Sequence, residues 1–307
     1  MKAFPFLRRG SPDPQARAAR QGSPPWVLAA AATTVVLWAS AFPGTRYALT
    51  AYSPLPLALL RLCIAAGTLA AWALITRIPP PARRDLPVFA AFGLVGIALS
   101  SVSLITGLQS ISAGAGSFLV GTIPVFSALL ARVWFQERVG RLGWLGIAIS
   151  MAGIGLIAFG EGSGFRINWG AGWIVTSALC QSLYYVGQKP LLRRYSALQV
   201  SVYSIACGAL LLTPLAGVLA PELRRAPWQA TAAAAYLGVF PVGVAFVAWS
   251  YALARAKAAR VTSAMYVMPA ISITLAYFWL GEVPHALSLL GGATALAGVA
   301  VLSLWGR

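Results

Sequence analysis

The chain has 307 residues, of which 59% are hydrophobic and only 9% are charged. Soluble domains carry about 25% charged residues, so this composition excludes a soluble globular protein. The formal net charge of +17 does not indicate nucleic-acid binding, because that function needs basic residues gathered on a polar domain, and none is visible in the sequence. Three cysteines, at positions 63, 180 and 207, lie in apolar stretches, which favours core packing over a disulfide framework.

Residues 1–24 are rich in Pro, Arg, Gly and Ser, and we predict a disordered, basic cytoplasmic tail. Ala39-Ser40-Ala41 then resembles a signal-peptidase site, but the apolar run before it fits better as the first of many permanent spans. A membrane-spanning helix needs about 20 mostly apolar residues. Ten such segments follow the tail, at 26–45, 55–76, 86–106, 112–135, 142–160, 170–188, 198–219, 229–251, 258–280 and 285–305.

The placement of Lys and Arg tests this number of spans. With the N-terminus in the cytoplasm, 18 of the 23 basic residues fall in inner segments and four in outer segments. The remaining one, Arg61, lies within a span. This bias is the one that the positive-inside rule requires, and adding or removing a span would scramble it. We therefore predict an all-α integral membrane protein with both termini in the cytoplasm.

The two halves of the chain repeat each other with a shift of 145 residues. Trp134-Phe135-Gln136-Glu137 is matched by Trp279-Leu280-Gly281-Glu282, and Pro124 is matched by Pro269. Such self-similarity indicates an internal duplication, which divides the chain into repeats at 25–160 and 165–307. Each repeat holds five spans, an odd number, so the second copy would enter the membrane upside down. This is the inverted-topology architecture of many secondary transporters, whose substrate site lies near the midplane.

The sequence resembles the EamA-type ten-helix branch of the drug/metabolite transporter superfamily over about residues 26–305. The resemblance rests on Trp38-Ala39-Ser40-Ala41-Phe42, on Arg61 and on the Pro–Glu–Gly-rich run of spans four and five. It implies an exporter of amino acids, aromatic or otherwise neutral, or of related small metabolites, in the bacterial inner membrane. Phosphorylated sugars and drug-like cations, transported elsewhere in the superfamily, are the alternative substrates.

Arg61 is the most informative single residue. It lies about two turns inside the second span, where an arginine costs about 2.5–3.5 kcal/mol at the helix centre and usually faces a cavity or a partner. One interpretation is a docking point for a substrate carboxylate. The other is a structural arginine that hydrogen-bonds backbone carbonyls or extends its head group toward the membrane surface.

Prolines occupy corresponding positions in the two halves and predict bent helices. Pro124 and Pro269 interrupt spans four and nine, and Pro241 in span eight lies opposite Gly96 in span three. Each proline frees a backbone carbonyl, and interrupted helices in matching positions point to the binding region of a transporter. Ordinary kinked packing is the alternative.

Aromatic and polar side chains cluster at depths that face this region. Such walls suit an amphipathic substrate, because they bury its apolar part and offer OH and NH groups to its polar part. Interfacial belts and lipid contacts are the alternative role for some of them. With Arg61, the predicted substrate-binding residues are Trp38, Ser40, Gln109, Tyr184, Gln188, Tyr203, Trp249 and Tyr266.

The sequence contains no catalytic constellation and no phosphate-binding loop, so we expect neither an enzyme nor ATP hydrolysis. No acid lies in mid-span, which predicts uncoupled or weakly coupled transport. Glu137 and Glu282, at the ends of spans, are interpreted as helix-end residues that pair with arginine, with proton coupling as the alternative. We expect no cofactor or metal ion. The expected partners are a small-molecule substrate and the lipid bilayer, with a monomer among the possible oligomeric states.

Overall fold

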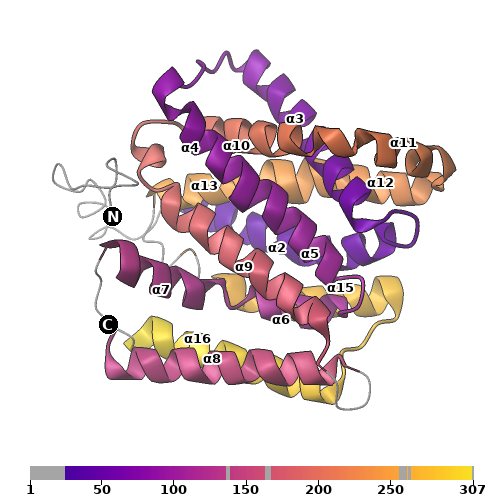
Figure 1. The fold of residues 1–307 in the computed structure, drawn as a ribbon. Helices are drawn as coiled ribbons and strands as arrows, with labels where there is room; N and C mark the ends of the chain where they lie inside the picture. The colour runs from indigo at the N-terminus through magenta and orange to yellow at the C-terminus, as the bar shows by residue number, and fades with distance from the viewer. Residues whose placement is uncertain (1–24, 136–138, 163–166, 256–260, 262–263, 306–307) are drawn as a thin grey trace.

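The computed structural model describes residues 25–135, 139–162, 167–255, 261 and 264–305. Within these ranges every regular element is helical and no strand is present. The predicted tail, residues 1–24, lies outside the described residues. Figure 1 shows the helices packed side by side in one bundle.

The first half of the chain forms eight main helical elements. They are α2 (Pro25–Ala48), α3 (Pro54–Ile75), α4 (Leu86–Phe92), η3 (Gly93–Leu99), α5 (Ser100–Gly107), α6 (Ala113–Val120), α7 (Ile123–Phe135) and α8 (Arg141–Gly160). The second half forms α9 (Trp169–Gly187), α10 (Ala197–Leu212), α11 (Ala216–Arg225), α12 (Trp228–Leu237), η6 (Gly238–Val244), α13 (Ala245–Arg255), η7 (Ala264–Val267), α15 (Met268–Leu280) and α16 (Ala286–Trp305).

Eight continuous helical segments of the described chain are long and apolar enough to cross a membrane. They are Pro25–Ala48, Pro54–Ile75, Arg83–Leu108, Ala113–Trp134, Arg141–Gly160, Ala197–Arg225, Trp228–Arg255 and Ala286–Leu304. The ninth predicted span corresponds to a shorter apolar helix, Ala264–Leu280. The sixth corresponds to α9, which carries several polar side chains. The total of ten membrane spans therefore remains a prediction.

The shift of 145 residues reappears in the positions of the helices. Adding 145 to the residue numbers of the π-helical segment η3 gives the bounds of the π-helical segment η6. The same shift converts the bounds of α7 into those of α15, and the bounds of α8 into those of α16. Equivalent residues thus adopt equivalent local structure in both halves. The boundaries of the two repeats, 25–160 and 165–307, stay predictions.

Helices α8 and α16 run antiparallel and lie side by side along their length (Figure 1). Gly146 meets Gly298, and Gly153 meets Gly291, so backbone touches backbone. Ser150 Oγ reinforces the pair by donating to the Ala295 carbonyl over 2.9 Å. The two contacts are equivalent under the repeat, because Gly146 corresponds to Gly291 and Gly153 corresponds to Gly298. The two equivalent helices are therefore related by a local twofold axis, and small residues permit their close approach.

The predicted prolines do interrupt helices. Pro124 lies in the first turn of α7, just after α6 has ended at Val120, and Pro269 lies in the first turn of α15, just after η7. Pro241 lies inside η6, where the wider π-helical turn accommodates a residue that lacks a backbone N–H. Discontinuous helices therefore meet at matching places in the two halves.

Candidate functional site

A central cavity with room for about 50 Å³ of solvent lies where the two halves of the chain meet. Its walls come from α2, α3, α5, α6, α9, η6, α13 and α15, which include the interrupted helices. The lining residues are Trp38, Ala41, Phe42, Arg61, Ser100, Ser101, Leu104, Val120, Gln181, Pro241, Val242, Phe246 and Met268. The cavity is therefore mostly apolar and holds a few polar groups, as small-molecule sites commonly do.

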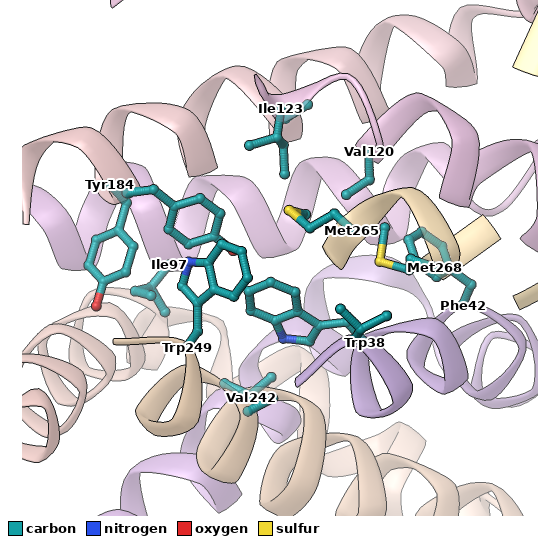
Figure 2. Packing of buried hydrophobic residues seen from close by; sticks show 14 of the residues in the cluster. Trp38, Phe42, Ile97, Val120, Ile123, Tyr184, Val242, Trp249, Met265 and Met268 are labelled. Carbon is teal, nitrogen blue, oxygen red and sulfur yellow. The ribbon is translucent and has the colours of Figure 1, made fainter. Parts of the chain in front are cut away.

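One wall of the cavity is built around Trp38, an aromatic residue of α2. Its ring centroid lies 5.9 Å from that of Tyr185, 5.6 Å from that of Phe246 and 5.1 Å from that of Trp249. The indole nitrogen donates a hydrogen bond of 3.0 Å to the carbonyl of Pro241 in η6. Figure 2 shows the two tryptophans beside one another in this cluster. The contacts fix the orientation of the Trp38 ring against the cavity.

Arg61 of α3 contributes the charge of the cavity. The residue is 4% exposed, so its guanidinium does not extend to the surface. Its Nη1 atom donates one long bond of 3.3 Å to Thr45 Oγ1. Its Nε atom has no hydrogen-bond partner among the described residues. The guanidinium thus faces the cavity with part of its donor capacity unused.

The polar part of the lining around Gln181 is neutral and is held by its own hydrogen bonds. Gln181 of α9 accepts from Tyr185 OH over 3.0 Å and donates to Ser177 Oγ over 3.1 Å. The Ser177 hydroxyl in turn donates to the Ser100 carbonyl over 2.8 Å. This chain of bonds fixes the Gln181 amide at the cavity wall.

Of the residues predicted from sequence, the structure places Trp38, Arg61 and Pro241 on the cavity wall. Gln181 was missed, although an amide one turn before Tyr184 on an apolar span is a visible signal. Most other lining residues are apolar and carry no chemical signal in the sequence. They include Phe42, Leu104, Val120, Val242, Phe246 and Met268.

Seven of the nine predicted substrate-binding residues are not among those that line the cavity, and four of the seven make their contacts elsewhere. Ser40 Oγ shares a hydrogen bond of 2.6 Å with the Tyr236 hydroxyl, and Tyr203 OH donates to the Pro79 carbonyl over 3.0 Å. Tyr266 OH bonds to residues of α16. Gln109 lines a separate, more open hollow between the α5–α6 turn and the start of α9. The structure therefore does not bring these four to one site.

The three remaining predicted residues, Tyr184, Gln188 and Trp249, are buried near the aromatic wall without lining the cavity. The Gln188 side-chain carbonyl accepts from Ser250 Oγ over 3.1 Å. Gln188 Nε2 and Trp249 Nε1 have no hydrogen-bond partner among the described residues. The aromatic rings of Tyr184 and Trp249 nevertheless belong to the main hydrophobic cluster (Figure 2).

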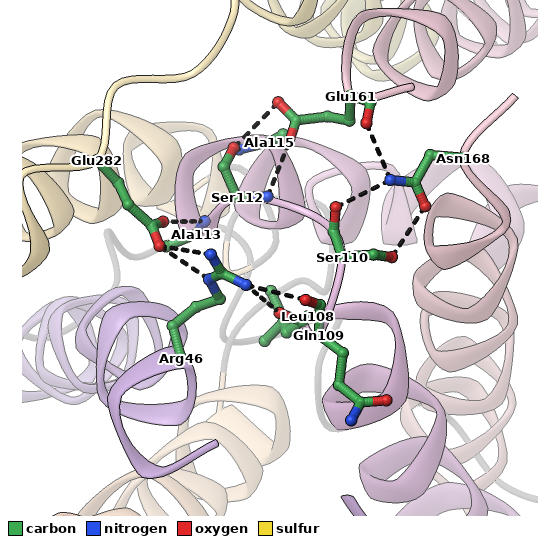
Figure 3. Close-up of polar contacts among 10 residues, drawn as sticks. All are labelled: Arg46, Leu108, Gln109, Ser110, Ser112, Ala113, Ala115, Glu161, Asn168 and Glu282. Carbon is green, nitrogen blue, oxygen red and sulfur yellow. Dashed lines mark hydrogen bonds and ion pairs between the residues drawn. The ribbon is translucent and has the colours of Figure 1, made fainter. Parts of the chain in front are cut away.

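A polar network joins the two halves at one end of the helices (Figure 3). Glu282 forms an ion pair of 2.8 Å with Arg46 and accepts from the Ala113 backbone N–H over 3.1 Å. Arg46 also donates to the carbonyls of Leu108 and Gln109. Glu282 is thus a helix-end residue paired with arginine, as interpreted from the sequence. Its counterpart Glu137 lies outside the described residues.

A second ion pair lies at the opposite end of the same helical run. Arg194 binds Asp85 through both terminal nitrogens, at 2.7 and 3.1 Å, and Tyr195 OH donates to the same carboxylate. Asp85 precedes α4, whereas Leu108, the partner of Arg46, follows α5. In the described part of the chain, one ion pair thus joins the first half to the second at each end of the bundle.

Comparison with known proteins identifies the family. The model of the EamA-like transporter family matches residues 25–159 and again residues 168–304. The chain belongs to the EamA-like transporter family. This family assignment and the apolar helices together make it a multi-pass membrane protein.

Several relatives of the chain cover most of its length. A protein of Streptantibioticus cattleyicolor named "Probable terminal-alkyne amino-acid exporter" is 38% identical over 88% of this chain and 91% of its own. The Bacillus subtilis transporter YdfC is 36% identical over 86% of both chains. A solved crystal structure with 21% identity matches 92% of this chain and 97% of its own with a TM-score of 0.66, which shows a shared fold.

Proposed function

We propose that this EamA-family protein exports amino acids, aromatic or otherwise neutral, or related small metabolites across the bacterial inner membrane. The observation that carries the proposal is the central cavity, which combines apolar walls, a few fixed polar groups and one buried arginine. Support comes from the S. cattleyicolor relative, whose name describes export of an amino acid. The E. coli relative YedA, 26% identical, is named as an inner membrane transporter.

The proposed topology has ten spans in two inverted repeats, with both termini in the cytoplasm. The distribution of Lys and Arg supports it, and so does the antiparallel packing of the equivalent helices α8 and α16. In this arrangement α9 and the η7–α15 pair are the sixth and ninth spans. Discontinuous helices at the midplane are typical of transporters whose substrate site lies between repeats.

Alternating access is the proposed mechanism, in which the two halves move against each other around the cavity. The Arg46–Glu282 and Asp85–Arg194 pairs join the halves at opposite ends, so each would separate when its own end opens. The four described acids lie at helix ends or in turns rather than in the cavity. Transport is therefore uncoupled or weakly coupled to protons, and the substrate moves down its own gradient.

The cavity disfavours the two alternative substrate classes. A phosphorylated sugar calls for two or more basic groups, whereas Arg61 is the one basic residue in its described lining. A drug-like cation calls for an acid, and the same lining contains none. The remaining class is a small amphipathic molecule without a net positive charge, and Trp38 and Arg61 are proposed to contact it.

Reconstitution tests the proposed function. Purified protein in proteoliposomes loaded with labelled neutral amino acids is expected to release label down the gradient, at a rate unchanged by a pH gradient. Liposomes that contain the Trp38→Ala variant are the matched control and should release label slowly. No efflux of any amino acid under either condition would remove the proposal, whereas accumulation driven by the pH gradient would remove only uncoupled transport.

A further inference from the structure

The charge of Arg61 is not compensated by any acid of the described chain. Asp85 is occupied by Arg194, Glu282 by Arg46, Glu222 by Ser53, and Glu161 by two serine hydroxyls. None of these acids lines the cavity. A buried ion is costly unless it is paired and fully hydrogen-bonded, yet Arg61 is 4% exposed and has one long bond from Nη1 and none from Nε.

We infer that the cavity recognises the carboxylate of its substrate through Arg61 and does not recognise the ammonium group. The inference rests on the proposed function and narrows its substrate class to amphipathic carboxylates. Guanidinium groups bind carboxylates with two parallel hydrogen bonds of matching geometry. A carboxylate that reaches the Nε–H of Arg61 and the adjacent terminal nitrogen would satisfy a donor that the described chain leaves unused.

The rest of the polar lining, which is Ser100, Ser101 and Gln181, offers an ammonium group only neutral oxygen atoms. The side-chain carbonyl of Gln181 already accepts from Tyr185 OH, and the Ser100 and Pro241 carbonyls already accept from Ser177 and Trp38. No carboxylate is present in the described lining to balance a positive charge. An amino group therefore gains little on entering the cavity.

The apolar lining completes the specificity. Phe42, Leu104, Val120, Phe246 and Met268 surround the space beyond the polar groups. A substrate with a carboxylate at one end and an apolar body therefore satisfies both parts of the site. Amino acids with apolar side chains belong to this class, and so do the 2-oxo acids and N-acyl amino acids that share their carbon skeletons.

Binding of matched ligands to the full-length protein in nanodiscs at pH 7 tests the inference. The probes are L-leucine, its 2-oxo acid, N-acetyl-L-leucine and L-leucinamide, with the corresponding L-phenylalanine set alongside. We expect the three carboxylates of each set to bind within about threefold of one another. The amide should bind about tenfold or more weakly, because a charge-assisted hydrogen bond is lost.

Two variants separate recognition from folding. In Arg61→Gln the preference for acid over amide should disappear, whereas in Arg225→Gln, an exposed arginine of α11, it should persist. Equal binding of amide and acid by the unaltered protein overturns the inference and leaves the proposed exporter in place, as does loss of binding by the oxo acid alone. Failure of every carboxylate to bind overturns the inference together with the proposed function.

Discussion

The contact between α8 and α16 allows a sharp prediction, because two glycines of the same helix differ in what surrounds them. A Cβ atom built on Gly153 would lie 2.4 Å from the Ala295 backbone nitrogen and 2.6 Å from the Gly291 carbonyl oxygen. A Cβ built on Gly155 would meet nothing within 4 Å. Both substitutions to alanine add the same methyl group, so they form a matched pair.

The magnitude follows from the distances. Backbone atoms cannot move aside singly, so reaching an ordinary contact of 3.4 Å or more requires α8 and α16 to separate locally by about 1 Å. A gap of this size forfeits a quarter to a half of the dispersion attraction at the affected contacts. Overpacking of this kind costs about 1–3 kcal/mol. In Gly155→Ala no contact is overpacked, so the better helix propensity of alanine, up to about 1 kcal/mol, can only stabilise the protein.

Thermal unfolding of the purified variants in one detergent measures the difference. Gly153→Ala should melt at a lower temperature than the unaltered protein, and Gly155→Ala at the same or a higher temperature. The repeat adds a second expectation, since a Cβ on Gly298 would lie 2.5 Å from the Gly146 oxygen. Gly298→Ala should therefore resemble Gly153→Ala. Equal melting temperatures for Gly153→Ala and Gly155→Ala would refute the close packing of α8 on α16.

Three further predictions concern hydrogen bonds and the ion pair. Ser150→Ala should lower the free energy of unfolding by about 0.6 kcal/mol, an average for hydrogen bonds between membrane helices. Ser103→Ala should be nearly neutral, because the buried Ser103 hydroxyl has no partner among the described residues. Urea or SDS titration compares the two variants, and a larger loss in Ser103→Ala contradicts the assignment. Trp38→Phe removes the indole donor to Pro241 but keeps an aromatic ring, so efflux should fall less than in Trp38→Ala. Equal efflux rates in the two variants would show that the aromatic ring does not contribute to transport. Glu282→Gln weakens the ion pair with Arg46, so the cavity should open more often at that end of the bundle. A cysteine introduced at Ser101 should then be labelled faster by a reagent added from that side. An unchanged labelling rate would show that the ion pair does not hold this end closed.

The sequence was sufficient for those features that depend on composition and chain chemistry. Helices of spanning length follow from the apolar runs, and breaks beside Pro124 and Pro269 follow from the missing backbone N–H. The equivalence of α8 and α16 follows from the repeat. The π-helical turns around Gly96 and Pro241 were not predicted, because they arise from tertiary packing rather than from local propensity.

The cavity was only partly predictable, and the reason is physical. A helix that faces lipid on one side and protein on the other is apolar all round, so amphipathic periodicity does not reveal the inward face. Arg61 and Trp38 stood out by their chemistry. Gln109 and Tyr203 stood out equally, yet Gln109 lies in the turn after α5 and the Tyr203 hydroxyl bonds to the Pro79 carbonyl, and neither residue lines the cavity. Residue type alone therefore could not separate a cavity residue from a polar or aromatic residue elsewhere on the helices.

Blocking the cavity tests most directly whether it is the transport path. Ser101 lines the cavity on α5, whereas Ala71 is exposed on the outside of α3, so Ser101→Trp fills the path and Ala71→Trp adds the same bulk elsewhere. The measurement is efflux of labelled L-leucine from proteoliposomes that hold equal amounts of each folded protein. We predict that Ser101→Trp abolishes efflux and that Ala71→Trp retains it. Efflux by Ser101→Trp at the rate of the unaltered protein would contradict transport through this cavity.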